Sequence, residues 1–150
     1  MANTYTSLHC HVIFSTKNRE PWLTEPIRKR LWPYLGGIAR ENQMKALEVG
    51  GVSDHVHILV SIPPTLAVAK AVQLIKGGSS HWIKETFPNT ATFSWQDGYG
   101  AFSVSESQLE AVAEYIRHQE EHHRTKSFTE EYRAFLARHQ IEYDERFLLG

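Results

Sequence analysis

The chain has 150 residues, of which 41% are hydrophobic and 22% are charged, with a net charge of −1. This composition excludes a disordered chain and predicts one compact domain spanning residues 1–150. The single cysteine excludes an internal disulfide and four-cysteine zinc sites. No apolar run approaches the roughly 20 residues of a membrane helix, so we expect a cytoplasmic protein with no membrane contact.

The charges are unevenly distributed along the chain. Residues 1–84 hold ten Lys or Arg and five Asp or Glu, whereas residues 85–150 hold six and twelve. A basic first half can face the phosphates of a nucleic acid. Two ordinary solvated surfaces would give the same asymmetry, so charge alone leaves a nucleic-acid partner open.

The hydrophobic pattern predicts strands and helices in the order β-α-β-β-α-β for the first part of the chain. Thr24 and Thr65 are expected to cap the two helices, and Asn42 to end the first of them. Gly36 and Gly37 weaken the middle of that helix. The expected elements are a strand at 5–15, a helix at 25–41, strands at 45–52 and 55–62, and a helix at 66–87.

The second part of the chain predicts a hairpin followed by helices. Asp97-Gly98 is a strong turn signal between expected strands at 93–95 and 99–104. Ser105 and Gln108 form a predicted capping box for a helix that runs to about residue 123. A last helix is expected at 129–139.

This order predicts an α+β fold with a ferredoxin-like or RRM-like core, in which helices cover one face of a mostly antiparallel sheet. The other face of the sheet would be open to a binding partner.

His55 and His57 are the sharpest local feature of the sequence. Because residues two apart on a strand project from the same face, the two imidazoles stand side by side, while Val56 and Ile58 face the other way. Two neighbouring imidazoles can chelate one metal ion if a further ligand comes from elsewhere. The alternative is a histidine pair that only forms hydrogen bonds.

Tyr115, Gln119 and His122 share one face of a predicted helix, because four and seven residues separate them. A tyrosine hydroxyl is a weak nucleophile unless something activates it or its target. A divalent ion can do so by polarising a phosphoryl oxygen. Without a metal nearby, Tyr115 is more simply a packing residue of an amphipathic helix.

Four sequence blocks occur in the order and spacing of a known family. They are residues 11–19, His55-Val-His57, residues 95–104, and a helix at 115–128 that carries Tyr115 and Gln119. In this combination the chain resembles the single-tyrosine HUH transposases of small bacterial insertion sequences. This is the IS200-like transposase family, which includes REP-associated tyrosine transposases. The resemblance weakens only in the last part of the chain, and His118 stands where many relatives have asparagine.

The resemblance implies a DNA transposase that cuts single-stranded DNA at hairpin-marked element ends. His55, His57 and Gln119 would bind a divalent metal, Mg²⁺ or Mn²⁺. Tyr115 would attack a DNA phosphate, giving a 5′-phosphotyrosine bond and a free 3′-hydroxyl, and another 3′-hydroxyl would reverse the reaction. The resemblance also implies a homodimer with composite active sites, in which the histidine pair of one subunit faces the tyrosine helix of the other.

The basic residues Lys17, Arg19 and Lys76 are candidates for contacts with DNA phosphates, although each can equally be a solubilising surface charge. Three other functions stay open: a domesticated HUH nuclease acting on genomic repeats, a metal-dependent phosphodiesterase that uses water, and a non-catalytic RRM-like nucleic-acid-binding module. Residues 98–102 match the RNA-stacking signature of such modules poorly. The last alternative also leaves the histidine pair and Tyr115 without a role.

Overall fold

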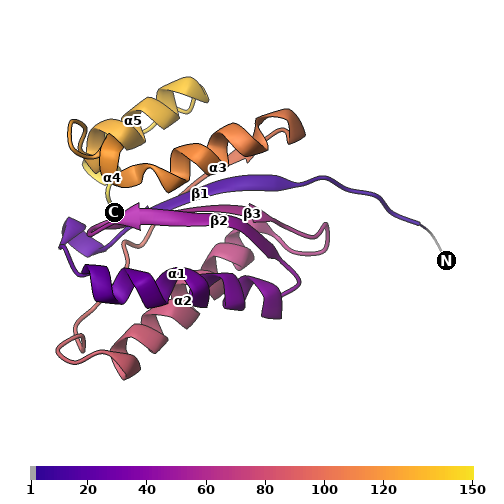
Figure 1. The fold of residues 1–150 in the computed structure, drawn as a ribbon. Coiled ribbons are helices and arrows are strands. Elements are labelled where there is room, and N and C mark those ends of the chain that lie inside the picture. Colours follow the sequence, from indigo (N-terminus) through magenta and orange to yellow (C-terminus); the bar gives the residue numbers. More distant parts are fainter. Residues whose placement is uncertain (1–2) are drawn as a thin grey trace.

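The computed structural model describes residues 3–150, so the first two residues of the expected domain lie outside the described residues. Over this range the chain forms a four-stranded antiparallel sheet with helices on both faces (Figure 1). The strand order β2-β3-β1-β4 is that of a ferredoxin-like core, which confirms the predicted α+β fold. None of the helices within residues 3–150 combines the length and apolar character of a membrane span.

The elements follow the expected order through the first two helices. The strands and helices are β1 (His9–Ser15), α1 (Glu25–Glu41), β2 (Lys45–Val52), β3 (His55–Ser61), α2 (Val68–Thr86), β4 (Gly100–Val104), α3 (Leu109–Arg117), α4 (Gln119–His122) and α5 (Phe128–Arg138). Three short 3₁₀ helices also occur: Lys17–Arg19 between β1 and α1, Glu106–Gln108 between β4 and α3, and Glu145–Phe147 after α5.

The main core lies between the sheet and the layer formed by α1 and α2, below the sheet in Figure 1. Alternate residues of β1 and β3 point into it, as the period of a strand requires. The helix α1 continues through Gly36 and Gly37 to Glu41, and Asn42 is its C-cap residue, as predicted. The central members of this core are Val12, Phe14, Leu31, Leu35, Val56, Ile58, Val60, Val72, Ile75 and Ile83.

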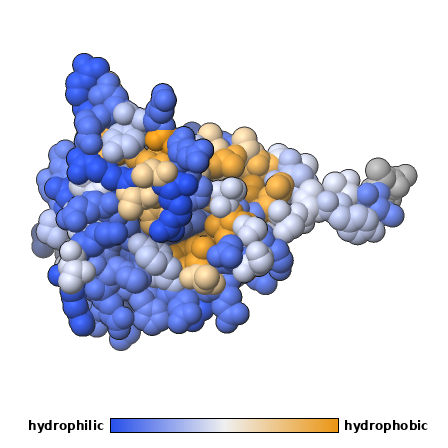
Figure 2. All heavy atoms as spheres, turned by 90° about the horizontal axis from the view of Figure 1, so that it is seen from above, coloured by the Kyte–Doolittle hydropathy of each residue, from blue (hydrophilic) through white to orange (hydrophobic). Residues whose placement is uncertain are grey.

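The opposite face of the sheet is covered by α3, α4 and α5, so the prediction of an open face was wrong (Figure 1). The helix α5 supplies enough apolar surface to bury this face, and a second core forms there. Seen from above this layer, hydrophilic residues cover much of the surface and hydrophobic atoms show between them (Figure 2). The second core consists of Ile13, Phe102, Phe128, Tyr132, Phe135, Leu136 and Leu148.

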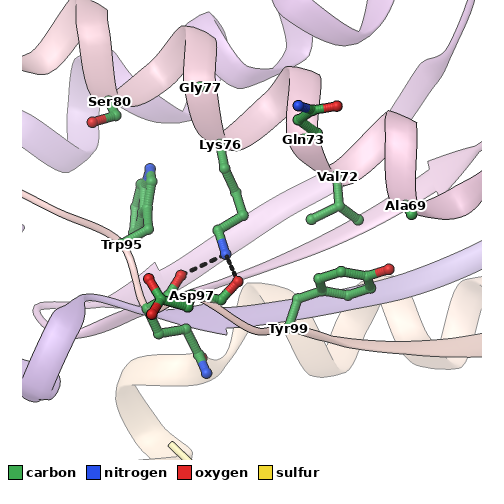
Figure 3. Close-up of a pocket in the computed structure, with 10 residues that line it drawn as sticks. Ala69, Val72, Gln73, Lys76, Gly77, Ser80, Trp95, Asp97 and Tyr99 are labelled. Carbon is green, nitrogen blue, oxygen red and sulfur yellow. Dashed lines mark hydrogen bonds between the residues drawn. The ribbon is translucent and has the colours of Figure 1, made fainter. Parts of the chain in front are cut away.

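The predicted hairpin at Asp97-Gly98 is absent from the described residues, and the segment before β4 runs as an irregular connection. Lys76 reaches from α2 to this segment (Figure 3). Its ammonium group donates to the carbonyl oxygens of Gln96, Asp97 and Gly98 at 2.5, 3.1 and 2.9 Å. The N–H of Gly98 donates to the carbonyl of Gly150 at 2.8 Å. These groups are therefore not free for pairing across a hairpin.

Helix starts and ends also differ from the prediction. The expected helix up to residue 123 divides at His118, whose φ of −103° and ψ of 28° are not helical. Ser105 makes no side-chain cap, and the capping box is formed instead by Ser127 and Glu130 at the start of α5. Ala67, rather than Thr65, precedes the first residue of α2.

The helix α3 crosses β2 at Gly50. A Cβ atom at Gly50 would lie 2.5 Å from the carbonyl oxygen of Ile116 and 2.9 Å from its Cγ2. We therefore expect Gly50→Ala to lower the free energy of unfolding by about 1–3 kcal/mol, measured by urea denaturation. Gly36, with nothing within 4 Å of the added Cβ, is the matched control: Gly36→Ala should raise stability by up to about 1 kcal/mol. A Gly50→Ala protein as stable as wild type would contradict this packing.

Candidate active site

The strand β3 carries His55 and His57 on the face of the sheet that α3, α4 and α5 cover. Both side chains are fully buried, and their ring centroids lie 5.1 Å apart. Val56 and Ile58 point into the main core on the other side. The two imidazoles therefore share one face, as the strand period predicts.

One nitrogen of each of these imidazoles is held by a neighbouring side chain. His55 donates from Nδ1 to Asp54 Oδ1 at 2.7 Å, and His57 Nδ1 lies 2.7 Å from His11 Nε2. His55 Nε2 faces Gln119 of α4 and Glu131 of α5, and His57 Nε2 faces Glu131. Such a partner on one nitrogen orients the other towards a shared centre, as is usual for metal-binding histidines.

The electrostatic environments of the two histidines differ. Burial disfavours the charged form of His55, but the carboxylates of Asp54 and Glu131 outweigh it and raise its pKa to about 9. At His57 burial dominates and lowers the pKa to about 4, although Glu131 acts in the opposite direction. The pair therefore offers one imidazole that prefers the charged form and one that prefers the neutral form.

The helices α3 and α4 bring Tyr115 and Gln119 to the same centre. The Tyr115 hydroxyl donates to Glu131 Oε2, and its ring stacks on His122 with centroids 4.4 Å apart. Burial, and then the Glu131 carboxylate, raise the pKa of Tyr115 above its usual value. Gln119 is buried, its Oε1 lies 3.1 Å from His55 Nε2, and its Nε2 donates to Glu131 Oε2 at 3.3 Å.

Glu131, from α5, lies at the middle of the cluster although the sequence analysis did not single it out. Its Oε1 lies 3.0 Å from His57 Nε2, 3.2 Å from His123 Nε2 and 3.5 Å from His55 Nε2. The histidines hold the pKa of this carboxyl far below its usual range, against the effect of burial. The signal that could have revealed it is its helical spacing: Glu131 lies three residues after Phe128 and four before Phe135, on the apolar face of α5, whereas its acidic neighbour Glu130 does not.

Four residues offer metal ligands here: His55, His57, His123 and Glu131. One ligand atom from each lies within 4.8 Å of all the others. Three imidazole nitrogens and a carboxylate oxygen suit a divalent first-row metal ion, and Gln119 Oε1 adds an oxygen 3.0 Å from His123 Nε2. This donor set fits a divalent metal. The sequence analysis missed His123 as a ligand; it directly follows α4, and its backbone N–H donates to the Gln119 carbonyl at 3.0 Å.

The three basic residues expected to contact DNA lie in different places. Arg19 is beside the site: it donates to Thr129 Oγ1 at 3.1 Å and lines a pocket that includes His123. Lys17 is exposed and lies 3.6 Å from Asp97 Oδ2. The ammonium group of Lys76 is used by backbone carbonyls on the other side of the molecule.

A ferredoxin-like sheet that presents a buried histidine pair to a tyrosine on a following helix is the arrangement expected of the HUH transposases. The family model described as "Transposase IS200 like" matches residues 4–119. The chain belongs to this IS200-like transposase family, a class of DNA-acting enzymes, which confirms the resemblance seen in the sequence.

Individual relatives agree with this assignment. The chain is 26% identical over 124 residues to the transposase for insertion sequence element IS200 of Salmonella typhimurium, covering 79% of this chain and 81% of that one. It is 27% identical over 117 residues to the ISDra2 transposase TnpA of Deinococcus radiodurans, covering 75% and 84%.

Solved structures share the fold. A Deinococcus radiodurans protein assigned as a transposase superposes with a TM-score of 0.63 at 25% identity, covering 79% of this chain and 96% of that one. A REP-associated tyrosine transposase bound to a REP hairpin superposes with a TM-score of 0.60 at 14% identity, covering 82% and 73%. The second comparison supports the fold alone.

Proposed function

We propose that this chain, as a single domain over residues 1–150, cuts and rejoins single-stranded DNA through a covalent bond to Tyr115. A divalent metal bound by His55, His57 and Gln119 would polarise a phosphoryl oxygen of the substrate. One observation carries the proposal: the tyrosine hydroxyl, the two imidazoles and the glutamine amide converge on one buried centre.

In the proposed reaction Tyr115 Oη attacks the phosphorus of a phosphodiester. The Oη–P bond forms while the bond from phosphorus to the 3′ oxygen breaks; the phenol loses its proton and the departing 3′ oxygen gains one. The products are a 5′-phosphotyrosine and a free 3′-hydroxyl. Because the new bond is again a phosphodiester, attack by another 3′-hydroxyl can rejoin strands without a nucleotide cofactor or water.

The neighbours of Tyr115 orient its hydroxyl but do not favour its ionised form. Its hydrogen bond to Glu131 and its stacking on His122 fix the direction of the hydroxyl. Since its pKa is raised, the hydroxyl is protonated at rest. Activation would therefore accompany binding of metal and DNA, and the resting protein would not carry a phenolate.

We further propose hairpin-bearing single-stranded DNA as the substrate and a homodimer as the active form. In the described residues, Tyr115 and His57 of the same chain both contact the carboxylate of Glu131. A dimer with composite sites would thus require α3, α4 and α5 to exchange between subunits. Sedimentation with and without hairpin DNA distinguishes a monomer from a dimer.

The proposed chemistry is tested by incubating the protein with Mn²⁺ and single-stranded oligonucleotides taken from the flanks of its own gene, including predicted hairpins. A protein–DNA adduct that resists denaturation supports the proposal. Cleavage without an adduct favours a water-using phosphodiesterase. Binding without either outcome favours a non-catalytic module or an inactive relative.

Arg19, Arg124 and Lys126 line a pocket of about 350 Å³ that reaches His123 at the edge of the cluster. We expect Arg19→Gln to raise KM for the oligonucleotide about 3- to 10-fold and to weaken its salt dependence, with kcat unchanged, because a phosphate contact positions the strand. Cleavage kinetics at several salt concentrations measure this effect. Arg40, exposed at the end of α1, is the matched control. If Arg40→Gln raised KM as much as Arg19→Gln, the pocket would have no special role.

A further inference from the structure

The residues that match the family model end at residue 119, but the cluster continues beyond them. Glu131 comes from α5, which is held against the sheet by Phe128, Tyr132 and Phe135. Its position between these residues turns Glu131 inward, and its side chain is only 2% exposed. A carboxylate so buried requires compensating partners, because desolvation of an unpaired charge is costly.

The compensation at Glu131 Oε1 comes from imidazoles. Among the described residues its ion-pair partners are His55, His57 and His123, and none is a lysine or arginine. The three imidazole Nε2 atoms and the carboxylate oxygen that they face make four ligand atoms, all of types that bind first-row metal ions. A divalent cation at this centre would compensate the carboxylate without requiring protonated histidines.

The second oxygen of the same carboxylate has a different task. Glu131 Oε2 accepts the hydrogen bond of the Tyr115 hydroxyl and one from Gln119 Nε2 at 3.3 Å. The two oxygens of one rigidly placed side chain therefore connect the imidazole group with the proposed nucleophile.

We propose that Glu131 is a metal ligand supplied from outside the family-matched segment, and that the same carboxylate positions Tyr115. Oε1 belongs to the metal site together with His55, His57 and His123, and Oε2 holds the tyrosine hydroxyl. This inference rests on the proposed function, which requires metal binding at the histidine pair. It also specifies the ion: a set rich in imidazole favours Mn²⁺ over Mg²⁺, which prefers oxygen ligands.

The ligand role is tested by calorimetric titration of the full-length protein with MnCl₂ or MgCl₂ in the absence of DNA. We expect Mn²⁺ to bind at least about 10-fold more tightly than Mg²⁺. Glu131→Gln should weaken Mn²⁺ binding at least about 10-fold and change the electron paramagnetic resonance spectrum of bound Mn²⁺, while Glu131→Asp restores part of the affinity. Glu142→Gln, the same change at an exposed position of the C-terminal segment, should bind Mn²⁺ as wild type does.

Each outcome of this titration is decisive. Wild-type affinity in Glu131→Gln rejects Glu131 as a ligand but leaves the proposed function standing. A wild-type protein that binds neither ion removes the metal from the proposed function and the present inference with it. If circular dichroism shows that Glu131→Gln does not fold, His123→Asn replaces it: loss of Mn²⁺ affinity supports the extended ligand set and unchanged affinity rejects it.

The positioning role has its own measurement, made at saturating Mn²⁺. We expect Glu131→Gln to lower kcat for adduct formation about 10- to 100-fold while KM for DNA stays within about 2-fold, because misplacement of the nucleophile affects the chemical step. Glu142→Gln should change neither value. A kcat restored to wild type by saturating metal would reject positioning and leave only the ligand role.

Discussion

Tyr115→Phe is expected to abolish the covalent protein–DNA adduct and to slow DNA cleavage at least about 10³-fold, because it removes the only atom of this side chain that can form a bond to phosphorus. The aromatic ring would remain stacked on His122. The change therefore deletes the hydroxyl and little else. Denaturing electrophoresis of reactions with labelled hairpin oligonucleotides measures both effects.

Two controls separate loss of the nucleophile from damage to the site. Tyr5→Phe makes the same chemical change at a side chain that is 89% exposed, and should cleave as wild type does. Tyr115→Phe should itself keep its Mn²⁺ affinity within about 2-fold, since the ligand atoms are unchanged. Persistent cleavage in Tyr115→Phe would exclude Tyr115 as nucleophile and favour a phosphodiesterase that uses water.

His57→Ala is expected to weaken Mn²⁺ binding and DNA cleavage each by at least about 10²-fold. It removes the Nε2 atom that lies 3.0 Å from Glu131 and leaves His11 without its partner at 2.7 Å. Unpaired buried groups of this kind cost about 1–3 kcal/mol, so stability in the absence of metal should fall as well. Calorimetry with MnCl₂, cleavage assays and thermal unfolding measure the three effects.

The matched control for His57→Ala is His81→Ala. His81 is exposed on α2, where its Nε2 lies 3.2 Å from Glu85 in a surface pair, and its loss should change stability and activity little. A folded His57→Ala protein that binds Mn²⁺ as tightly as wild type would show that the metal, if one is used, binds elsewhere.

Much of the fold could be predicted from local pattern alone. The alternation of β3 fixed which side of the sheet His55 and His57 face, and the spacing of apolar residues predicted α1 and α2. The prediction of a hairpin at Asp97-Gly98 was wrong because a residue distant in sequence contacts that segment: Lys76 donates hydrogen bonds to its backbone carbonyl groups. Turn signals cannot anticipate such a contact.

The residues of the candidate site also fall into two groups, those that the sequence predicts and those that only the structure reveals. His55, His57, Tyr115 and Gln119 follow from spacing and from the family resemblance, and the structure brings all four together. His123 and Glu131 depend on tertiary structure. The break at His118, which bonds through Nδ1 to the Glu114 carbonyl at 2.7 Å, separates α4 from α3. Glu131 enters the cluster because α5 covers a face of the sheet that was expected to be open.

The most direct test of the central claim is to locate the covalent bond in the wild-type protein. After reaction with Mn²⁺ and a hairpin oligonucleotide, the adduct is digested with a protease and a nuclease and examined by mass spectrometry. The proposed chemistry predicts a peptide in which Tyr115 carries the 5′-phosphate of the cut strand, together with a released fragment that ends in a free 3′-hydroxyl. Cut strands with free 5′-phosphates and an unmodified Tyr115, or attachment to a different residue, would contradict it.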